Sequence, residues 1–550
     1  MMNSHRLTLP QILLGVILLA YVVYGSVFIY QSSFDVDGTR YFALFDDAMI
    51  SMTYARNLAR GEGLVWYPGL KVEGYSNPLW VGYMSLWHLL PIPESKVSLA
   101  LQITGLVCML GLLVLVYKIA KQLSKGNELA SLLATGMVGF YYPLTNWSLL
   151  GNEVSILLLI TAACVWLAMK TQSDGKFRWQ MYALLAISLL IRLDAAVIFA
   201  VISGWLVLTD KANRWRHLVV GVGLGVLMLG GQTLFRWLYY GDIMPATYYL
   251  KMTGLPTLLR LQRGLYVTGL FFAELKWYLM PIPLLFLFWR RDKQVALGYL
   301  LFMAMVLYSI YVGGDAWEHR GGANRFISLA MPFYLMLQAL AIVHMADWIA
   351  NGLARIANRK LAWLKGLARV GAAIVCLAGL TIINLAKGSG TYADLIGNTK
   401  ESPLGYALLL KPSVYKPGTE RYTRDALLLR QVTSPDAKIA VIAAGNIAYF
   451  SDRPTVDMLG KSDMVIAKEP SRVGTDVSLM DLRPGHIKWD YAWSIGQLQP
   501  DVVVELRVST VEQGELYLDN YDRVAVNNHT MYFKQGSTNI NWEALEDVRD

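Results

Sequence analysis

Two adjacent carboxylates, Asp46 and Asp47, stand at the start of a segment with helical spacing. Apolar residues at positions 49, 52, 55 and 59 share one face of that segment, which is typical of a helix lying in the plane of a membrane surface. Neighbouring like charges raise one pKa, so the pair is suited to act as a general base or to bind a divalent cation such as Mg²⁺, Mn²⁺ or Ca²⁺. Helix capping and compensation of the helix dipole explain the same two residues equally well.

Further ionisable residues lie beside the ends of long apolar runs. Such side chains are costly near lipid unless they form ion pairs or line a water-filled cavity, so their concentration predicts a functional site. A structural ion pair at the end of a membrane span is the alternative for each of them. In chain order they are Glu73, Glu153, Arg192, Asp194, Lys251, Asp315, His319, Arg320 and Arg325.

The apolar runs that must position these residues indicate a polytopic membrane domain over residues 1–387. The chain has 550 residues, of which 55% are hydrophobic and 16% charged, whereas soluble chains are about a quarter charged. Segments that can cross the hydrocarbon core need roughly 20 apolar residues. We predict eleven of them, near 11–30, 97–117, 128–145, 153–169, 180–192, 194–209, 217–239, 266–288, 295–312, 326–348 and 370–386.

Charge decides how the spans are oriented. If the short run 79–90 between Pro78 and Pro91 is an interfacial helix, the basic clusters of the loops all share one side with Arg6, in accordance with the positive-inside rule. The N-terminus is then cytoplasmic. The first apolar run is longer than that of a signal peptide and is followed by no clear small-residue cleavage site, so we expect an uncleaved first span. We expect a multi-pass membrane protein with its ionisable site on the outer side.

Residues 388–550 have the composition of a water-soluble domain, which the topology places on the extracytoplasmic (periplasmic) side. They carry a formal charge of −5, against +14 for residues 1–387. A helical pattern at 421–431 alternates with strand-like runs at 438–443, 454–458, 501–506, 523–526 and 530–533, which predicts a small α/β domain. The three cysteines all lie inside apolar runs, so no disulfide framework is indicated.

Motifs along nearly the whole chain resemble those of the GT-C glycosyltransferases. Among these, the similarity is to the terminal β-(1→2)-arabinofuranosyltransferase family of mycobacterial cell-wall synthesis. The matching stretches are Asp46-Asp47-Ala48, Val72-Glu73-Gly74-Tyr75-Ser76-Asn77, Gly151-Asn152-Glu153, Arg192-Leu193-Asp194, Gly241-Asp242-Ile243-Met244-Pro245 with Lys251, Gly313-Gly314-Asp315, and Gly485-His486 with Lys488 and Asp490. The chain departs from the family at Asn152, Leu193 and Ala246. An insertion at 321–324 leaves both Arg320 and Arg325 as matches for one family arginine.

The resemblance implies an inverting transfer of a sugar, with arabinofuranose as the family's example, from a polyprenyl-phosphate donor. The acceptor would be a cell-envelope glycan or glycolipid at the outer face of the bacterial cytoplasmic (inner) membrane. Asp46 would be the leading base, with Asp47 as its neighbour or the alternative, and Arg192, Lys251, His319, Arg320 and Arg325 would bind the donor phosphate. Residues that would orient these cations or bind sugar or acceptor are Glu73, Tyr75, Asn77, Glu153, Asp194, Asp315, His486 and Asp490. A surface turn after Pro484 explains the last two residues equally well.

Two other classes of protein fit the same sequence. A secondary transporter would place charged residues within its spans and show repeated halves, which the chain does not show. A noncatalytic envelope assembly factor would use the C-terminal domain as a binding module. Membrane lipid is an expected partner in every case, and nothing in the sequence indicates binding to nucleic acid.

Overall fold

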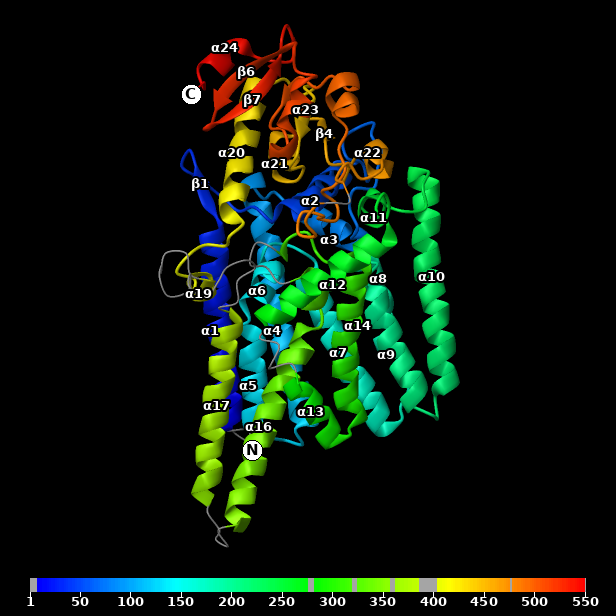
Figure 1. The fold of residues 1–550 in the computed structure, drawn as a ribbon, viewed down its shortest axis with the longest axis vertical. Helices are drawn as coiled ribbons and strands as arrows, with labels where there is room; N and C mark the ends of the chain where they lie inside the picture. Colours follow the sequence, from blue (N-terminus) through cyan, green and yellow to red (C-terminus); the bar gives the residue numbers. More distant parts are fainter. Residues whose placement is uncertain are drawn as a thin grey trace.

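The computed structural model of the chain describes residues 7–275, 281–318, 324–356, 362–384, 403–474 and 477–549. A long bundle of helices lies beneath an α/β domain, and the first polar loop of the chain lies between them (Figure 1). The two chain termini lie at opposite ends of the molecule. This architecture confirms the expected mainly α membrane protein with a C-terminal α/β domain.

The bundle consists of apolar helices joined by short connections. Among the described residues, seven helices are long and apolar enough to cross a membrane, and four shorter apolar helices of 10–17 residues accompany them. The helices are α1 (Leu9–Ser32), α4 (Glu94–Leu123), α5 (Glu128–Gly139), α6 (Tyr142–Leu149), α7 (Val154–Asp174), α8 (Trp179–Ile191), α9 (Ala195–Thr209), α10 (Arg214–Tyr240), α11 (Ala246–Met252), α12 (Thr257–Glu274), α13 (Pro281–Arg290), α14 (Lys293–Val312), α15 (Arg325–Ser328), α16 (Met331–Ile356) and α17 (Ala362–Asn384).

Eight of the eleven expected spans each match one helix of the bundle. The runs 128–145, 266–288 and 326–348 instead extend over α5 and part of α6, parts of α12 and α13, and α15 and part of α16. The run 79–90 forms the eleven-residue helix α3 (Pro78–His88), which packs against α2 (Asp46–Ala59) and is too short to cross a bilayer.

The first loop also contains a hairpin that the analysis of spans did not include. Strands β1 (Phe34–Val36) and β2 (Thr39–Tyr41) pair antiparallel through Asp37 and Gly38, which both have positive φ. Asp-Gly is a strong hairpin signal because both central residues of a type I′ turn require positive φ. The signal is therefore in the sequence, although the strands it joins are only three residues long.

The C-terminal domain is built on a five-stranded sheet in the order β4-β3-β5-β7-β6. Strand β3 pairs parallel with β4 and β5, while β7 pairs antiparallel with β5 and β6. All of the expected strands and the expected helix are present. The elements are α19 (Pro403–Ala407), α20 (Lys416–Val432), β3 (Ile439–Val441), α21 (Asn446–Ser451), β4 (Thr455–Asp457), α22 (Met464–Lys468), a π-helical turn (Ala492–Gln497), β5 (Val502–Val503), a 3₁₀ turn (Val508–Thr510), α23 (Val511–Glu515), β6 (Tyr521–Val526), β7 (His529–Lys534) and α24 (Trp542–Glu546).

The first loop and the C-terminal domain share one hydrophobic core. Met49 and Tyr54 of α2 are buried in the same cluster as Ile447 and Phe450 of α21. A Cβ at Gly445 would overlap the backbone carbonyl of Asp46, so only glycine allows this approach. The division at residue 387 therefore separates membrane-like from water-soluble composition, whereas the packing joins the first loop to the C-terminal domain.

A buried ion pair fixes α10 to the first loop. Arg236 Nε lies 3.0 and 2.8 Å from the two carboxylate oxygens of Glu73, and both side chains are 3% exposed. The backbone carbonyl of Glu73 accepts a hydrogen bond from Ala246 at the start of α11. Glu73 thus joins the loop, α10 and α11.

We predict that Glu73→Gln lowers the free energy of unfolding by about 3–5 kcal/mol, because it leaves the Arg236 charge buried without its partner. Unfolding of the protein in lipid nanodiscs measures this loss. The double variant Glu73→Leu/Arg236→Met removes both charges and is expected to regain most of the stability. Equal stability of Glu73→Gln and the unaltered chain would contradict the role of this pair.

Candidate functional site

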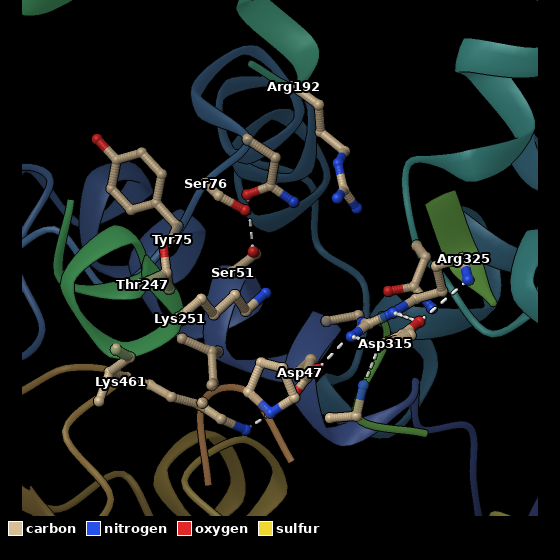
Figure 2. A pocket seen from close by; sticks show the side chains of 18 of the residues that line it. Asp47, Ser51, Tyr75, Ser76, Arg192, Thr247, Lys251, Asp315, Arg325 and Lys461 are labelled. Carbon is tan, nitrogen blue, oxygen red and sulfur yellow. Dashed lines mark hydrogen bonds and ion pairs between the residues drawn. The ribbon is translucent and has the colours of Figure 1, made fainter. Parts of the chain in front are cut away.

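A polar pocket of about 870 Å³, open to solvent, lies where the bundle meets the C-terminal domain. Its walls come from α2, the turn 74–77, the N-terminal end of α7, the hinge between α8 and α9, α11 and the segments 312–316 and 325–326. Lys461 and residues 484–486 of the C-terminal domain complete the wall. Cationic and anionic side chains from these separate elements point toward one another across the pocket (Figure 2).

Asp47 is held by cations from two different parts of the chain. Its Oδ1 accepts from Lys461 Nζ at 2.6 Å, and its Oδ2 accepts from Arg325 Nη1 at 3.0 Å and Trp317 Nε1 at 3.3 Å. Burial by itself would raise the pKa of Asp47, but Lys461 and Arg325 hold that pKa well below its usual range. Asp47 is therefore a carboxylate at neutral pH.

Arg325 and Arg192 are each fixed by carboxylates. Arg325 Nε and Nη2 donate to Asp315 at 2.8 and 2.9 Å in a bidentate pair. Arg192 donates from Nε and Nη2 to Asp194 at 2.9 and 2.5 Å, and from Nη1 to Glu153 at 2.7 Å. Both guanidinium groups are thus oriented before any ligand enters the pocket.

Lys251 is the cation with no such partner. Its ammonium makes no hydrogen bond or ion pair with any residue that the structure describes, and Figure 2 shows it extending into the middle of the pocket. Burial and the nearby charges of Arg325 and Arg192 lower the pKa of Lys251 to about 8. An anion entering the pocket would find this ammonium available.

Neutral hydrogen-bonding groups also line the pocket or lie beside it. Asn77 Nδ2 donates to Glu153 Oε2 at 2.9 Å, and Asn77 Oδ1 accepts from Ser51 Oγ at 2.9 Å. The hydroxyl groups of Tyr75 and Tyr240 are 2.9 Å apart. Burial and the charge of Lys461 lower the pKa of His486 to about 3, so its ring is neutral at physiological pH. These groups suit a polyhydroxylated ligand better than a second charged one.

Most of the residues predicted from the sequence meet in this pocket. Those that line it are Asp47, Tyr75, Asn77, Glu153, Arg192, Lys251, Asp315, Arg325 and His486. Asp194 lies behind Arg192, Glu73 pairs with Arg236, and Asp490 accepts from Arg472 and from the backbone of Trp493. His319 and Arg320 lie outside the described residues, so of the two candidate arginines the structure places Arg325.

Asp46, expected as the leading base, does not line the pocket. Its carboxylate accepts hydrogen bonds from the backbone of Gly445 and from the backbone and side chain of Asn446, at 3.2, 2.9 and 3.2 Å. Burial raises the pKa of Asp46. Successive residues of an α-helix point about 100° apart, so adjacent carboxylates at the start of α2 face different surroundings.

The divergence of the two carboxylates also bears on the expected divalent cation. The carboxylate of Asp46 accepts a hydrogen bond from the backbone of Asn446 in the C-terminal domain, whereas the carboxylate of Asp47 is paired with Lys461 and Arg325. Within the described ranges, no group of three or more His, Cys, Asp or Glu side chains is placed to hold a metal ion. The two carboxylates thus face different neighbours, and binding of a divalent cation by this pair stays a prediction.

The sequence analysis did not select Lys461, Trp317, Ser51 or Thr247. Lys461 lies 414 residues from Asp47 along the chain, in a loop that also approaches the first loop closely. A Cβ at Gly74 would collide with Ser462 and with the carbonyl of Lys461. The Gly-Lys-Ser sequence at 460–462 is the available signal, but it gives no indication of what the lysine faces.

The bundle with its C-terminal α/β domain has the GT-C fold. Residues 415–542 match the family described as "Domain of unknown function (DUF8728)". No curated protein sequence matches the chain significantly.

Three solved structures illustrate the similarity of fold. ArnT from Cupriavidus metallidurans in the apo state is 14% identical, with a TM-score of 0.54 over 94% of this chain and 97% of that chain. The apo oligosaccharyltransferase of Archaeoglobus fulgidus is 12% identical, with a TM-score of 0.54 over 96% and 75% of the two chains. AglB from Archaeoglobus fulgidus, in complex with an inhibitory peptide and a dolichol-phosphate, is 10% identical, with a TM-score of 0.55 over 94% and 74%.

We predict that Lys251 reacts with an amine-acylating reagent at a rate that reaches half its maximum near pH 8. The lowered pKa leaves the amine protonated below that pH and nucleophilic above it, whereas ordinary lysines titrate near about 10.4. Peptide mass spectrometry after brief labelling at a series of pH values measures the rate. A midpoint near pH 10 would show that the pocket does not perturb Lys251.

Proposed function

We propose that this protein is an inverting glycosyltransferase that uses a polyprenyl-phosphate sugar as donor. The observation that carries the proposal is the GT-C fold with a pocket in which Lys251, Lys461 and Arg325 face the carboxylate of Asp47. One neighbour in fold, AglB, was solved in complex with an inhibitory peptide and a dolichol-phosphate, a lipid of the same chemical class. The acceptor is proposed to be a glycan or glycolipid of the cell envelope.

The cations supply a site for the donor phosphate. Lys251 offers its three N–H donors, and the guanidinium of Arg325 suits phosphate oxygens. A lipid-linked donor keeps its tail in the bilayer, so a pocket at the end of the bundle is where its phosphate would arrive. We therefore expect the KM for donor to rise as the pH increases through about 8, where Lys251 loses its charge.

Asp47 is the best placed base among the pocket carboxylates. Its side chain is 21% exposed, against 6% for Glu153 and 2% for Asp315. A donor phosphate would compete with Asp47 for Lys461 and Arg325. Because those cations lower its pKa, their withdrawal would raise that pKa and make Asp47 a stronger base once the donor is bound.

The reaction then requires one displacement at the anomeric carbon. The oxygen of an acceptor hydroxyl forms a bond to that carbon on the face opposite the phosphate, and the bond from the carbon to the phosphate oxygen breaks. Asp47 takes the hydroxyl proton, and the polyprenyl phosphate leaves with the bonding electron pair. Lys251, Lys461 and Arg325 stabilise the charge that develops on the phosphate.

For the sugar we propose arabinofuranose, which rests on the sequence motifs alone. The same motifs support placement of the pocket on the outer side of a bacterial cytoplasmic membrane. The distribution of basic loop residues, which puts the C-terminal domain opposite the cytoplasm, agrees with this placement.

The lipid that copurifies with the protein tests the donor class. We expect mass spectrometry of a mild-detergent or nanodisc preparation to find a phosphopolyprenol, whose headgroup then identifies the sugar. Lys251→Met is expected to retain less of it than Lys251→Arg, because only arginine keeps the charge. Phosphopolyprenol at the same low level in the unaltered chain and in Lys251→Met would contradict the proposed donor.

Substitution of the two adjacent carboxylates tests which of them is the base. Asp47→Asn is expected to lower kcat about 10²–10⁴-fold in sugar transfer from the identified donor, because the amide cannot accept the hydroxyl proton. Asp46→Asn is expected to lower kcat less than tenfold and to weaken the packing of the C-terminal domain. Initial rates and thermal unfolding of both variants distinguish the two effects. Full transfer by Asp47→Asn with loss in Asp46→Asn would assign the base to Asp46.

A further inference from the structure

A second polar pocket, of about 790 Å³, lies on another face of α2. Thr53, Arg56, Asn57 and Arg60 line it at the i, i+3, i+4, i+7 spacing of one helical stripe. The facing wall comes from the C-terminal domain, at the turn between α21 and β4 and at Pro435 and Asp436.

The guanidinium groups of this second pocket are held by acceptors of the protein. Arg60 makes a bidentate pair with Asp452 at 2.9 and 2.9 Å, and Arg56 Nη2 approaches the same carboxylate at 3.0 Å. Arg453 donates to the backbone carbonyls of Arg430 and Thr433 at 2.9 and 2.8 Å. The lining contains as many carboxylates as arginines, so no excess positive charge favours a phosphate or another anion.

Two carboxylates on the rim remain available. Glu62 and Asp436 are exposed, and their side chains make no hydrogen bond or ion pair with other described residues. They can accept hydrogen bonds from hydroxyl groups, whereas a negatively charged ligand would be repelled by them. The free polar groups of this pocket therefore favour a neutral ligand rich in hydroxyl groups.

An aromatic wall completes the pocket. Trp66 is fixed because its indole N–H donates to the carbonyl of Thr455 at 2.7 Å, and half-buried Tyr67 and exposed Pro68 follow it. Aromatic rings offer apolar faces that can pack against the C–H face of a sugar ring while hydroxyl groups reach polar neighbours. The combination of Tyr67 with Glu62 and Asp436 is therefore suited to a saccharide.

We propose that this second pocket binds a neutral oligosaccharide, the acceptor glycan of the transfer, and in that respect the proposal rests on the proposed function. Asp47 and Arg56 are nine residues apart on α2, which places them about 14 Å apart along the helix axis. Ser51 of the first pocket and Thr53 of the second are only two residues apart. A glycan chain held at the second pocket raises the concentration of its own end near Asp47. Long acceptors would then be used at lower concentration than short ones.

Direct binding without donor tests the site independently of catalysis. The probes are linear arabino-, manno- and gluco-oligosaccharides of eight residues, added to the full chain in lipid nanodiscs and followed by saturation-transfer difference NMR. We expect at least one of them to bind, and its affinity to fall about tenfold in Tyr67→Ala and in Asp436→Asn. Tyr67→Phe keeps the ring and is expected to keep the affinity.

Matched controls separate local from general effects. Tyr517→Ala removes an exposed tyrosine of the C-terminal domain that lies outside both pockets. This variant is expected to leave binding unchanged. Asp47→Asn, which disables the proposed transfer, is also expected to bind the octasaccharide normally, so loss of transfer and loss of this site are distinguishable. Thermal unfolding confirms that each variant is folded.

Three results would overturn the proposal. The first is that no octasaccharide binds the unaltered chain. The second is that Tyr67→Ala and Asp436→Asn bind the octasaccharide as tightly as the unaltered chain does. The third is that both variants lose binding of inorganic phosphate rather than of a saccharide. In the transfer assay the corresponding expectation is a tenfold higher KM for the octasaccharide acceptor in Tyr67→Ala, with kcat unchanged. A lower kcat with unchanged KM would place Tyr67 outside acceptor binding.

Discussion

The ion pairs of Asp47 are the interaction on which the pocket depends. One carboxylate meets Lys461 from the C-terminal domain and Arg325 from α15, and so joins three parts of the chain at one point. Charges at the edge of a membrane domain are costly unless they are paired. The pairing of these groups therefore stabilises the fold, and it also places a base and two cations beside one another. Because the pairs are partly exposed, a phosphate can exchange with the carboxylate without first breaking the hydrophobic core.

The same constraint explains how the remaining cations differ. Arg192 is fixed between Glu153 and Asp194, while Arg325 keeps two of its nitrogens on Asp315. These ion pairs fix the orientation of both guanidinium groups in the pocket. Lys251 has no carboxylate partner among the described residues. Burial and the nearby arginines therefore lower its pKa, and its ammonium stays available to a ligand. Fixed guanidinium groups together with a free ammonium give a site that is preorganised and still open to an anion.

Much of this architecture follows from patterns that the sequence shows directly. Apolar length predicts the helices, and strand-like runs predict the sheet, since both depend on local composition. Nine of the proposed site residues meet in the pocket because motifs at the ends of spans converge there. The choice between Asp46 and Asp47 depends on the rotation of α2 against α21, which no local pattern encodes. Lys461 and the pairing of Glu73 with Arg236 depend likewise on contacts between distant segments.

The core shared by the first loop and the C-terminal domain has a consequence for biosynthesis. Asp47 and Lys461 are 414 residues apart, so at about 5–20 residues per second the ribosome needs roughly 20–80 s to supply the second after the first. During that interval the apolar face of α2 has no Phe450 or Ile447 to cover it. We therefore expect the apolar face of α2 in the nascent chain to contact the membrane surface or a chaperone. The pocket is complete only after the C-terminal domain has been translated.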